Sequence, residues 1–296
     1  MSPVMRHEFL GVRIDDLSGV ELETKLESWL TQEGGHTIAT PNAEFLLLAR
    51  KNPAFADLLN RSDLAMADSV SLQYAAAALS DHRLEHRVPG VDLLERLCTL
   101  SADRGTRVLF LGGAPSAAES SAQKMRQKFD ALDVVALDPG RIRWNESRLE
   151  VVDELVDRIN VTLPSVVAVA LGQHKQEQFI AQVKDKCPSV KIWIGVGGAF
   201  EMISGQKRRA PRALSRLGLE WLWRLWIEPR RARRIVNAII VFPLLIVHEA
   251  LRRGTFFRST LKVFLEILRT MITTPSPSLP AGRQGLKRRG TGPYER

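Results

Sequence analysis

The sequence lacks the short motifs that would assign it directly to several large enzyme classes. It contains no D-x-D, no H-E-x-x-H and no G-x-S-x-G. Their absence argues against metal-chelating nucleotide-sugar transferases, zinc proteases and α/β-hydrolases. The G-x-G-x-x-G fingerprint and the ribose-binding acid that follows it are also missing. A nucleotide-dependent oxidoreductase or epimerase therefore stays only as an alternative.

Cysteine is scarce, and long apolar runs are absent. Cys98 and Cys187 are the two cysteines and have no C-x-x-C spacing, so we expect buried free thiols in a reducing compartment. Residues 1–16 include no apolar segment of the signal-peptide kind, and none is expected. The longest apolar run, 235–247, has 13 residues, whereas about 20 are needed to cross a bilayer. We expect this run to be interfacial, re-entrant or packed on a partner.

Charge is divided unevenly along the chain, whose net charge is +9. Residues 205–296 carry 20 basic and 5 acidic side chains, which leaves 22 basic and 28 acidic ones in residues 1–204. An acidic body joined to a basic tail suggests work at an anionic surface or on an anionic, partly apolar substrate. Tryptophans and leucines interleave with the arginines in 217–226, as in peripheral membrane helices. A solvated basic face and a nucleic-acid-binding module are the alternatives.

Short β-rich runs alternate with amphipathic helical patterns through the first two thirds of the chain. This alternation predicts an α/β fold with a mostly parallel sheet and helices on both faces. The expected strands are 36–40, 64–67, 108–111, 134–136, 166–171 and 190–196. The expected helices are 43–60, 70–80, 91–104, 116–129, 147–160 and 175–186.

The chain beyond residue 204 looks wholly helical, with helices expected over 211–227, 230–252 and 256–272. Residues 274–296 are rich in Pro, Gly, Ser and Arg, and we expect them to be disordered because they bury too little apolar surface. Three units are therefore expected. They are a catalytic domain (1–204), a basic helical appendage (205–273) and a disordered tail (274–296).

Ligands of parallel α/β folds bind at the carboxyl ends of the strands, and polar residues follow several of the expected strands. Asp68 suits either a general base or the cap of the next helix. Thr40 and Asn42 lie in a similar turn, where Asn42 is also a good helix cap. Arg87 would clamp a diphosphate by charge-assisted hydrogen bonds, although a lone loop arginine is more often solvated.

Two further turns are candidates for substrate binding. Gly112 and Gly113 would let backbone N–H groups approach a phosphate, although a tight turn alone would explain them. The stretch 173–177 places Gln173, Gln176 and Glu177 after a buried strand, which is unusual for a purely structural turn. The histidine of this stretch, His174, has no His, Cys or Asp partner at metal-ligand spacing, so no metal site is expected.

Together these turns resemble the WecG/TagA/CpsF family of bacterial glycosyltransferases over roughly residues 8–234. The motifs that carry the resemblance are TPNAEF (40–45), ADS (67–69), HRVPG (86–90), VLFLGG (108–113), ALGQHKQE (170–177), IGVGGAFEMISG (194–205) and RAPR…GLEWLWRLWIEPRR (209–231). The resemblance implies a Rossmann-like fold and an inverting, metal-independent transferase. Such enzymes move N-acetylmannosamine or a related sugar from a UDP-sugar to polyprenyl-diphosphate-linked N-acetylglucosamine. It also implies a peripheral location on the cytoplasmic face of the membrane.

Carried over residue by residue, the resemblance makes Asp68 the general base and places Thr40 and Asn42 in its pocket. Arg87 would lie near the diphosphate, and Gln176 falls in the family's PKQE-type turn. Three arginines of the appendage would meet the phosphates: Arg224, Arg231 and Arg234. Ser69 and His174 stand where the family usually has Gly and Pro, which leaves the donor sugar open. The polymer made and a homo-oligomeric state are open as well.

Overall fold

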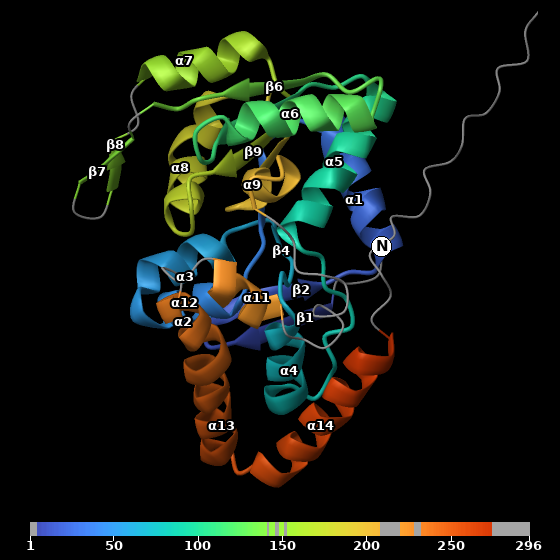
Figure 1. Ribbon diagram of the computed structural model, residues 1–296, viewed down its shortest axis with the longest axis vertical. Coiled ribbons are helices and arrows are strands. Elements are labelled where there is room, and N and C mark those ends of the chain that lie inside the picture. Colours follow the sequence, from blue (N-terminus) through green and yellow to red (C-terminus); the bar gives the residue numbers. More distant parts are fainter. Residues whose placement is uncertain are drawn as a thin grey trace, which may run out of the picture.

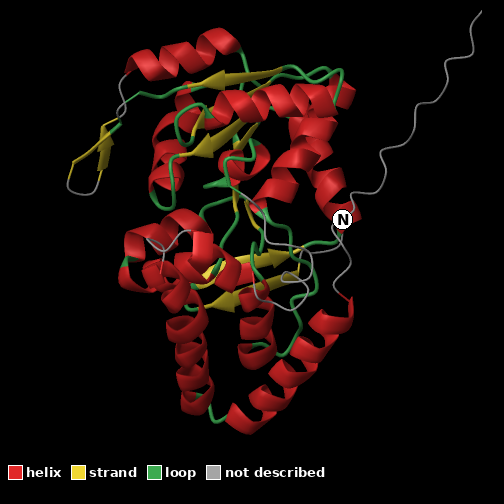
Figure 2. Ribbon diagram, viewed as in Figure 1, coloured by secondary structure: helices red, strands yellow, loops and turns green. Residues whose placement is uncertain are grey.

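The computed structural model describes residues 5–140, 142–145, 148–150, 153–207, 220–227 and 232–273. The tail expected to be disordered, 274–296, lies outside these residues. At the centre is a six-stranded sheet of order β4-β3-β10-β9-β5-β6, in which every neighbouring pair is parallel. Its strands are β3 (His36–Ala39), β4 (Leu64–Ala65), β5 (Val108–Gly112), β6 (Val134–Leu137), β9 (Val166–Ala170) and β10 (Ile192–Gly195). All six expected strands are confirmed, and the fold is α/β and Rossmann-like (Figure 2).

Helices cover both faces of this sheet because successive strand residues point to opposite sides. Val108 and Phe110 of β5 belong to one core, while Leu109 and Leu111 belong to another. The first core is completed by α1 (Gly19–Thr31), α5 (Gly90–Arg104), α6 (Ala117–Lys128) and α9 (Ala199–Ile203). The second is completed by α7 (Asp153–Thr162) and α8 (Lys175–Val183), and a short 3-10 turn, Lys184–Lys186, follows α8.

A third core lies at the other end of the molecule, below the sheet in Figure 1. It packs an antiparallel hairpin, β1 (Met5–Phe9) and β2 (Val12–Asp16), against α2 (Ala43–Lys51), α3 (Pro53–Asn60) and α4 (Val70–Leu79). Phe242 and Ile246 from the C-terminal helices are buried in the same core. The C-terminal segment is therefore packed into the body at this end.

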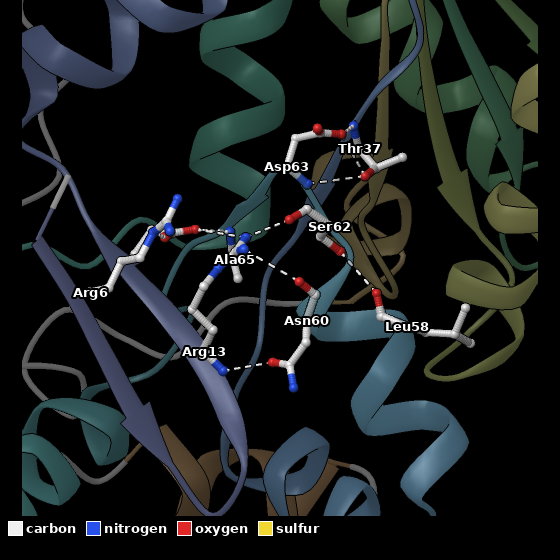
Figure 3. Close-up of polar contacts among 9 residues, drawn as sticks. Arg6, Arg13, Thr37, Leu58, Asn60, Ser62, Asp63 and Ala65 are labelled. Carbon is white, nitrogen blue, oxygen red and sulfur yellow. Dashed lines mark hydrogen bonds and ion pairs between the residues drawn. The ribbon is translucent and has the colours of Figure 1, made fainter. Parts of the chain in front are cut away.

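Polar contacts fix the hairpin to the edge of the sheet (Figure 3). The backbone N–H of Arg13 donates to Oδ1 of Asn60 at 2.8 Å, and its guanidinium bonds the carbonyl of Ser62. Oδ2 of the buried Asp15 accepts from the N–H of Ala65 at 2.8 Å. β2 thus lies beside β4, and Asp15 also forms a parallel backbone bridge with Met66 just beyond β4.

Several elements differ from the sequence-based expectation. The β1–β2 hairpin, α1 and α9 were not predicted, and neither was a second hairpin, β7 (Arg143–Asn145) with β8 (Arg148–Glu150). This hairpin occupies the start of the helix expected over 147–160, so α7 begins only at Asp153. The helix expected over 43–60 is two helices. Oδ1 of Asn52 caps the second by accepting from Phe55 N at 3.2 Å, with Pro53 at its first position.

The C-terminal helices are α11 (Glu220–Ile227), α12 (Ala232–Val236), a π turn (Asn237–Val241), α13 (Phe242–Arg252) and α14 (Phe256–Thr273). Ala232–Arg252 form one helical stretch of 21 residues, whose most apolar window has a mean hydropathy of 1.8. By length and composition this stretch is long enough to cross a membrane. This helical stretch is longer than the 13-residue apolar run seen in the sequence, because polar residues extend the helix at both ends. α13 and α14 diverge on either side of α4 in Figure 1.

Candidate functional site

Asp68 lies just beyond β4, at the carboxyl end of the sheet. Its backbone N–H donates to the carbonyl of Pro41 at 2.9 Å, and its Oδ1 accepts from the N–H of Gly90 at 2.9 Å. Gly90 is the first residue of α5, so the carboxylate lies at the N-terminus of that helix. The N-cap of α4 is Ser69, and its side chain makes no capping bond. The alternative that Asp68 caps α4 is therefore wrong.

Asn42 lies beside Asp68, and Thr40 lies at the end of the neighbouring strand β3. Oδ1 of Asn42 caps α2 by accepting from Glu44 N at 3.0 Å and from Phe45 N at 3.2 Å. Its Nδ2 points to Oδ2 of Asp68 at a long 3.5 Å. Asn42 therefore caps α2 and also lies next to Asp68 in the candidate site. Thr40 is buried and donates to the carbonyl of Gly195 on β10 at 3.3 Å, which joins the ends of two strands.

Arg87 reaches the same turn, where its NH1 donates to the carbonyl of Asp68 at 3.2 Å. The loop before it is held by Asp16 of β2. Oδ2 of Asp16 accepts from Glu85 N at 2.8 Å, and Oδ1 accepts from His86 N at 2.9 Å and bonds His86 Nδ1 at 2.8 Å. Burial raises the pKa of Asp16, but the polar contact with His7 at 3.7 Å and the hydrogen bonds from Glu85 and His86 outweigh it and lower the pKa to about 2. Asp16 therefore positions the segment that carries Arg87.

Gln176 and Glu177 of α8 are buried and bonded to the protein itself. Oε1 of Gln176 accepts from Gly197 N at 2.9 Å, and its Nε2 donates to Oε1 of Glu177 at 2.7 Å. Oε2 of Glu177 accepts from His174 N at 2.7 Å. Burial raises the pKa of Glu177 to about 7. A Cβ on Gly195 would lie 2.5 Å from Nε2 of Gln176, so this network requires a glycine at the end of β10.

The network places the turn after β9 against the turn after β10. Gln173, in the turn after β9, is half-buried. His174 adopts a φ of 73°, in the left-handed region that few side chains favour. Its ring contacts Phe55 edge-on, with centroids 5.0 Å apart, and burial lowers its pKa. Gln176 and Glu177, two of the three residues of this stretch that were candidates for substrate binding, thus bond to protein groups. These bonds hold the turn after β9 against the turn after β10.

The Gly112–Gly113 turn has the tight geometry that was one of the two explanations for these glycines. Both residues have positive φ, 88° and 89°, and a Cβ on Gly112 would lie 3.0 Å from the carbonyl oxygen of Ala170. The N–H of Gly113 donates to that carbonyl at 2.8 Å. The N–H of Gly113 is therefore already hydrogen-bonded to the protein at this edge of the sheet. The glycines allow the close approach of β5 and β9 at this turn.

Glu201 was assigned no role from the sequence, although it lies within the quoted motif 194–205. Its Oε1 accepts from Ala114 N at 3.2 Å, next to the Gly112–Gly113 turn. Its Oε2 is buried and has no hydrogen-bond partner among the described residues. A buried acceptor left open at the ligand edge of the sheet suits a polar hydrogen of a bound molecule. The only sequence signal was an acid after the Gly197–Gly198 turn.

The predicted arginines of the appendage are only partly described. Arg234 is exposed on α12, whereas the side chain of Arg224 and the whole of Arg231 lie outside the described residues. Within the described part of the chain, no group of three or more His, Cys, Asp or Glu could hold a metal ion. Cys98 and Cys187 are free and buried, as expected.

Comparison with known proteins points to the same family that the sequence motifs resemble. The family model described as "Glycosyl transferase WecG/TagA/CpsF family" matches residues 7–255. A relative from Bacillus spizizenii is 28% identical over 222 residues, which cover 75% of this chain and 83% of the relative. That protein is named N-acetylglucosaminyldiphosphoundecaprenol N-acetyl-beta-D-mannosaminyltransferase. Because the family model covers most of the chain, this protein belongs to the WecG/TagA/CpsF family of glycosyltransferases.

Proposed function

We propose that this protein transfers N-acetylmannosamine, or a related hexose or uronic acid, from a UDP-sugar to polyprenyl-diphosphate-linked N-acetylglucosamine. The product would serve the synthesis of a cell-surface polysaccharide or teichoic acid. The observation that carries the proposal is the placement of the Asp68 carboxylate, between the N-terminal amide of Gly90 and the side chain of Asn42. The family membership and the name of the Bacillus relative support the same acceptor and sugar.

In the proposed reaction, Asp68 takes the proton of the acceptor hydroxyl as its oxygen attacks the anomeric carbon of the donor. The bond from that carbon to the UDP oxygen breaks on the opposite face, and UDP leaves with the electron pair. A positioned base typically contributes about 10²–10⁴-fold to the rate. Because the Gly90 N–H and Asn42 hold the carboxylate, little reorientation is needed before proton transfer.

The leaving UDP gains negative charge, which cationic and dipolar groups would stabilise. Arg87 lies at the Asp68 turn, where its guanidinium donates to the carbonyl of Asp68 at 3.2 Å. The N-terminus of α5 and the arginines of the appendage would add to it. We propose that these groups serve in place of a metal ion, so that transfer is metal-independent.

The acceptor's polyprenyl tail requires the enzyme to work at a membrane. We propose a peripheral location on the cytoplasmic face, where the basic C-terminal segment meets anionic lipid. Each Lys or Arg near such a surface contributes about 1 kcal/mol. The lipid chain would then stay in the bilayer while its diphosphate-linked sugar enters the Asp68 site.

The test is UDP release from UDP-N-acetylmannosamine with a short-prenyl diphosphate-N-acetylglucosamine acceptor in the presence of EDTA. Wild type would be compared with Asp68→Asn, and Asp130→Asn would serve as a matched control because Asp130 is exposed and remote from the turn. We expect acceptor-dependent release that persists with EDTA, fails in Asp68→Asn and is unchanged in Asp130→Asn. No release from any of a panel of UDP-hexoses would refute the transferase proposal.

A further inference from the structure

Asp16 of β2 bonds the loop between α4 and α5 at two consecutive residues, just before Arg87. Its Oδ2 accepts from Glu85 N at 2.8 Å. Its Oδ1 accepts from His86 N at 2.9 Å and lies 2.8 Å from Nδ1 of the His86 ring. The Asp16 side chain is 3% exposed, so water does not compete freely for these donors. The backbone on the N-terminal side of Arg87 is therefore fixed to the end of β2.

The backbone on the C-terminal side of Arg87 is fixed as well. Val88 N donates to the carbonyl of Ala67 at 3.0 Å, and Gly90 N donates to Oδ1 of Asp68 at 2.9 Å. Arg87 itself is half-buried, and its NH1 donates to the carbonyl of Asp68 at 3.2 Å. Arg87 is thus held between two bonded neighbours, with its guanidinium at the Asp68 turn.

The N-terminal hairpin reaches the ligand edge of the sheet through Asp16. Asp15, the residue before it, forms a parallel bridge with Met66, two residues before Asp68. Parallel strands end at one edge, so the Asp16 carboxylate lies on the same side of the sheet as the site turns. On β1, Nε2 of the buried His7 lies 3.7 Å from Oδ2 of Asp16. Both strands of the hairpin therefore contribute to the contact that holds the Arg87 loop.

The charge of Asp16 determines which groups donate in this cluster. Although burial raises it, the pKa of Asp16 is about 2 because of the polar contacts. The carboxylate is therefore ionised near neutral pH and has only acceptors, so Nδ1 of His86 must carry the hydrogen of their bond. An amide in its place would have one acceptor oxygen for three donors. Its NH2 would meet either the N–H of Glu85 or both donors of His86.

We propose that Asp16 and His86 are positioning residues, which hold the backbone of Arg87 so that its guanidinium meets the diphosphate of the bound nucleotide. An oriented guanidinium binds a phosphate more tightly than one on an unsupported loop, because less conformational freedom is lost on binding. Neither Asp16 nor His86 needs to touch the ligand. The inference rests on the proposed function, since that function gives Arg87 its anionic ligand.

The two ring nitrogens of His86 let substitutions separate positioning from direct contact with a ligand. The amide nitrogen of asparagine reaches about the position of Nδ1, so His86→Asn keeps a donor for Asp16 but removes Nε2. His86→Leu removes both nitrogens. The His86 side chain is 40% exposed, so the fold should tolerate either change. Asp16→Asn alters the other partner of the bond.

The experiment is calorimetric titration of the full-length protein with UDP, which requires no transfer. The variants are Asp16→Asn, His86→Leu, His86→Asn and Arg87→Gln, together with the double variant of His86→Leu and Arg87→Gln. The matched control is Asp63→Asn. The carboxylate of Asp63 also accepts from a backbone N–H, that of Thr37 at 2.8 Å, but it lies just before β4, at the amino-terminal edge of the sheet.

We expect Arg87→Gln to weaken UDP binding about tenfold or more, as for the loss of a hydrogen bond to a charged group. Asp16→Asn and His86→Leu should each weaken it about fivefold, the scale of ordering one side chain on binding. His86→Asn and Asp63→Asn should stay within about twofold of wild type. In the Arg87→Gln background, His86→Leu should have no further effect, because the side chain that it positions is gone.

Unchanged UDP affinity in either Asp16→Asn or His86→Leu would overturn the proposal. Equal losses in His86→Asn and His86→Leu would also overturn it, because they would assign Nε2 a direct contact with the ligand. Additive losses in the double variant with Arg87→Gln would do the same. If the UDP pattern holds but no UDP-hexose is transferred, the proposed function fails and the positioning role stands. If transfer occurs while UDP affinity is indifferent to both residues, the positioning role fails alone.

Discussion

The carboxylate of Glu266 on α14 accepts two hydrogen bonds from one guanidinium, that of Arg83 in the loop between α4 and α5. Arg83 Nε lies 2.8 Å from Oε2, and NH2 lies 2.9 Å from Oε1. Glu266 is 7% exposed, so the pair is largely shielded on the acid's side. Since the same loop leads to Arg87, this bidentate pair links the last described helix to the segment that enters the candidate site.

We expect the pair to couple in a double-mutant cycle of Arg83→Gln and Glu266→Gln. Each single change should lower the free energy of unfolding by about 1–3 kcal/mol, and the double change by clearly less than their sum. Urea unfolding measures all four proteins. The control cycle is Arg258 with Asp81, an exposed pair at 3.6 Å, whose coupling should stay below about 1 kcal/mol. Additive effects at Arg83 and Glu266 would contradict the link.

Asp16 should stabilise the fold only while it is ionised. Its folded pKa of about 2 lies below the ordinary 3.8, so its contribution is present above about pH 4 and is lost as the pH falls through about 2. We expect Asp16→Asn to lower the free energy of unfolding by about 2 kcal/mol near neutral pH. The difference from wild type should shrink towards pH 2, whereas Asp130→Asn should show none at any pH. A difference independent of pH would mean that shape matters here and charge does not.

Glu201→Gln tests whether the open Oε2 serves a ligand. The change keeps the shape and leaves an oxygen for the Ala114 N–H, but it replaces the buried acceptor by a donor. If the proposed function holds, UDP should bind about tenfold or more weakly, as expected when one buried hydrogen bond is lost. Calorimetric titration with UDP measures the affinity, and Glu119→Gln on the exposed side of α6 is the control. Unchanged affinity in Glu201→Gln would reduce Glu201 to a packing role.

The central sheet could be predicted because its strands are covered on both faces. All five residues of β5 and all five of β9 are buried, so they appear in the sequence as unbroken apolar runs. The β1–β2 hairpin gives no such signal. In β1 only His7 and Phe9 are buried, and β2 ends in the buried acids Asp15 and Asp16. In the sequence, buried charged residues whose partners lie far along the chain have the same pattern as charged residues at the surface.

The site could be predicted as a set of turns but not as a set of contacts. Strand ends pointed to Thr40, Asp68 and the Gly112–Gly113 turn, because parallel strands end at one edge. The bond from Gly90 N to Asp68 joins residues 22 positions apart, and no local pattern encodes it. Likewise, only the structure shows that the N–H of Gly113 is engaged with Ala170.

Glu177 gives the fold a second pH dependence, with the opposite sign to that of Asp16. Burial raises its pKa from 4.5 to about 7. The folded protein therefore keeps a proton that the unfolded chain releases between these values. The contribution to stability is full below about pH 4.5 and declines as the pH rises through about 7. A shift of this size corresponds to about 3 kcal/mol.

Glu177→Gln removes this titration because an amide does not ionise. The variant loses one bond, since its NH2 faces either the amide of Gln176 or the N–H of His174, so it should be the less stable protein near pH 5. Between about pH 5 and pH 8 wild type should lose about 3 kcal/mol more than the variant. Urea unfolding across this range checks it, with exposed Glu23→Gln as the control. Burial also lowers the pKa of His174, but this histidine is present in both proteins, so its titration largely cancels in the difference. A difference between wild type and Glu177→Gln that stays constant with pH would mean that Glu177 is already ionised in the folded protein.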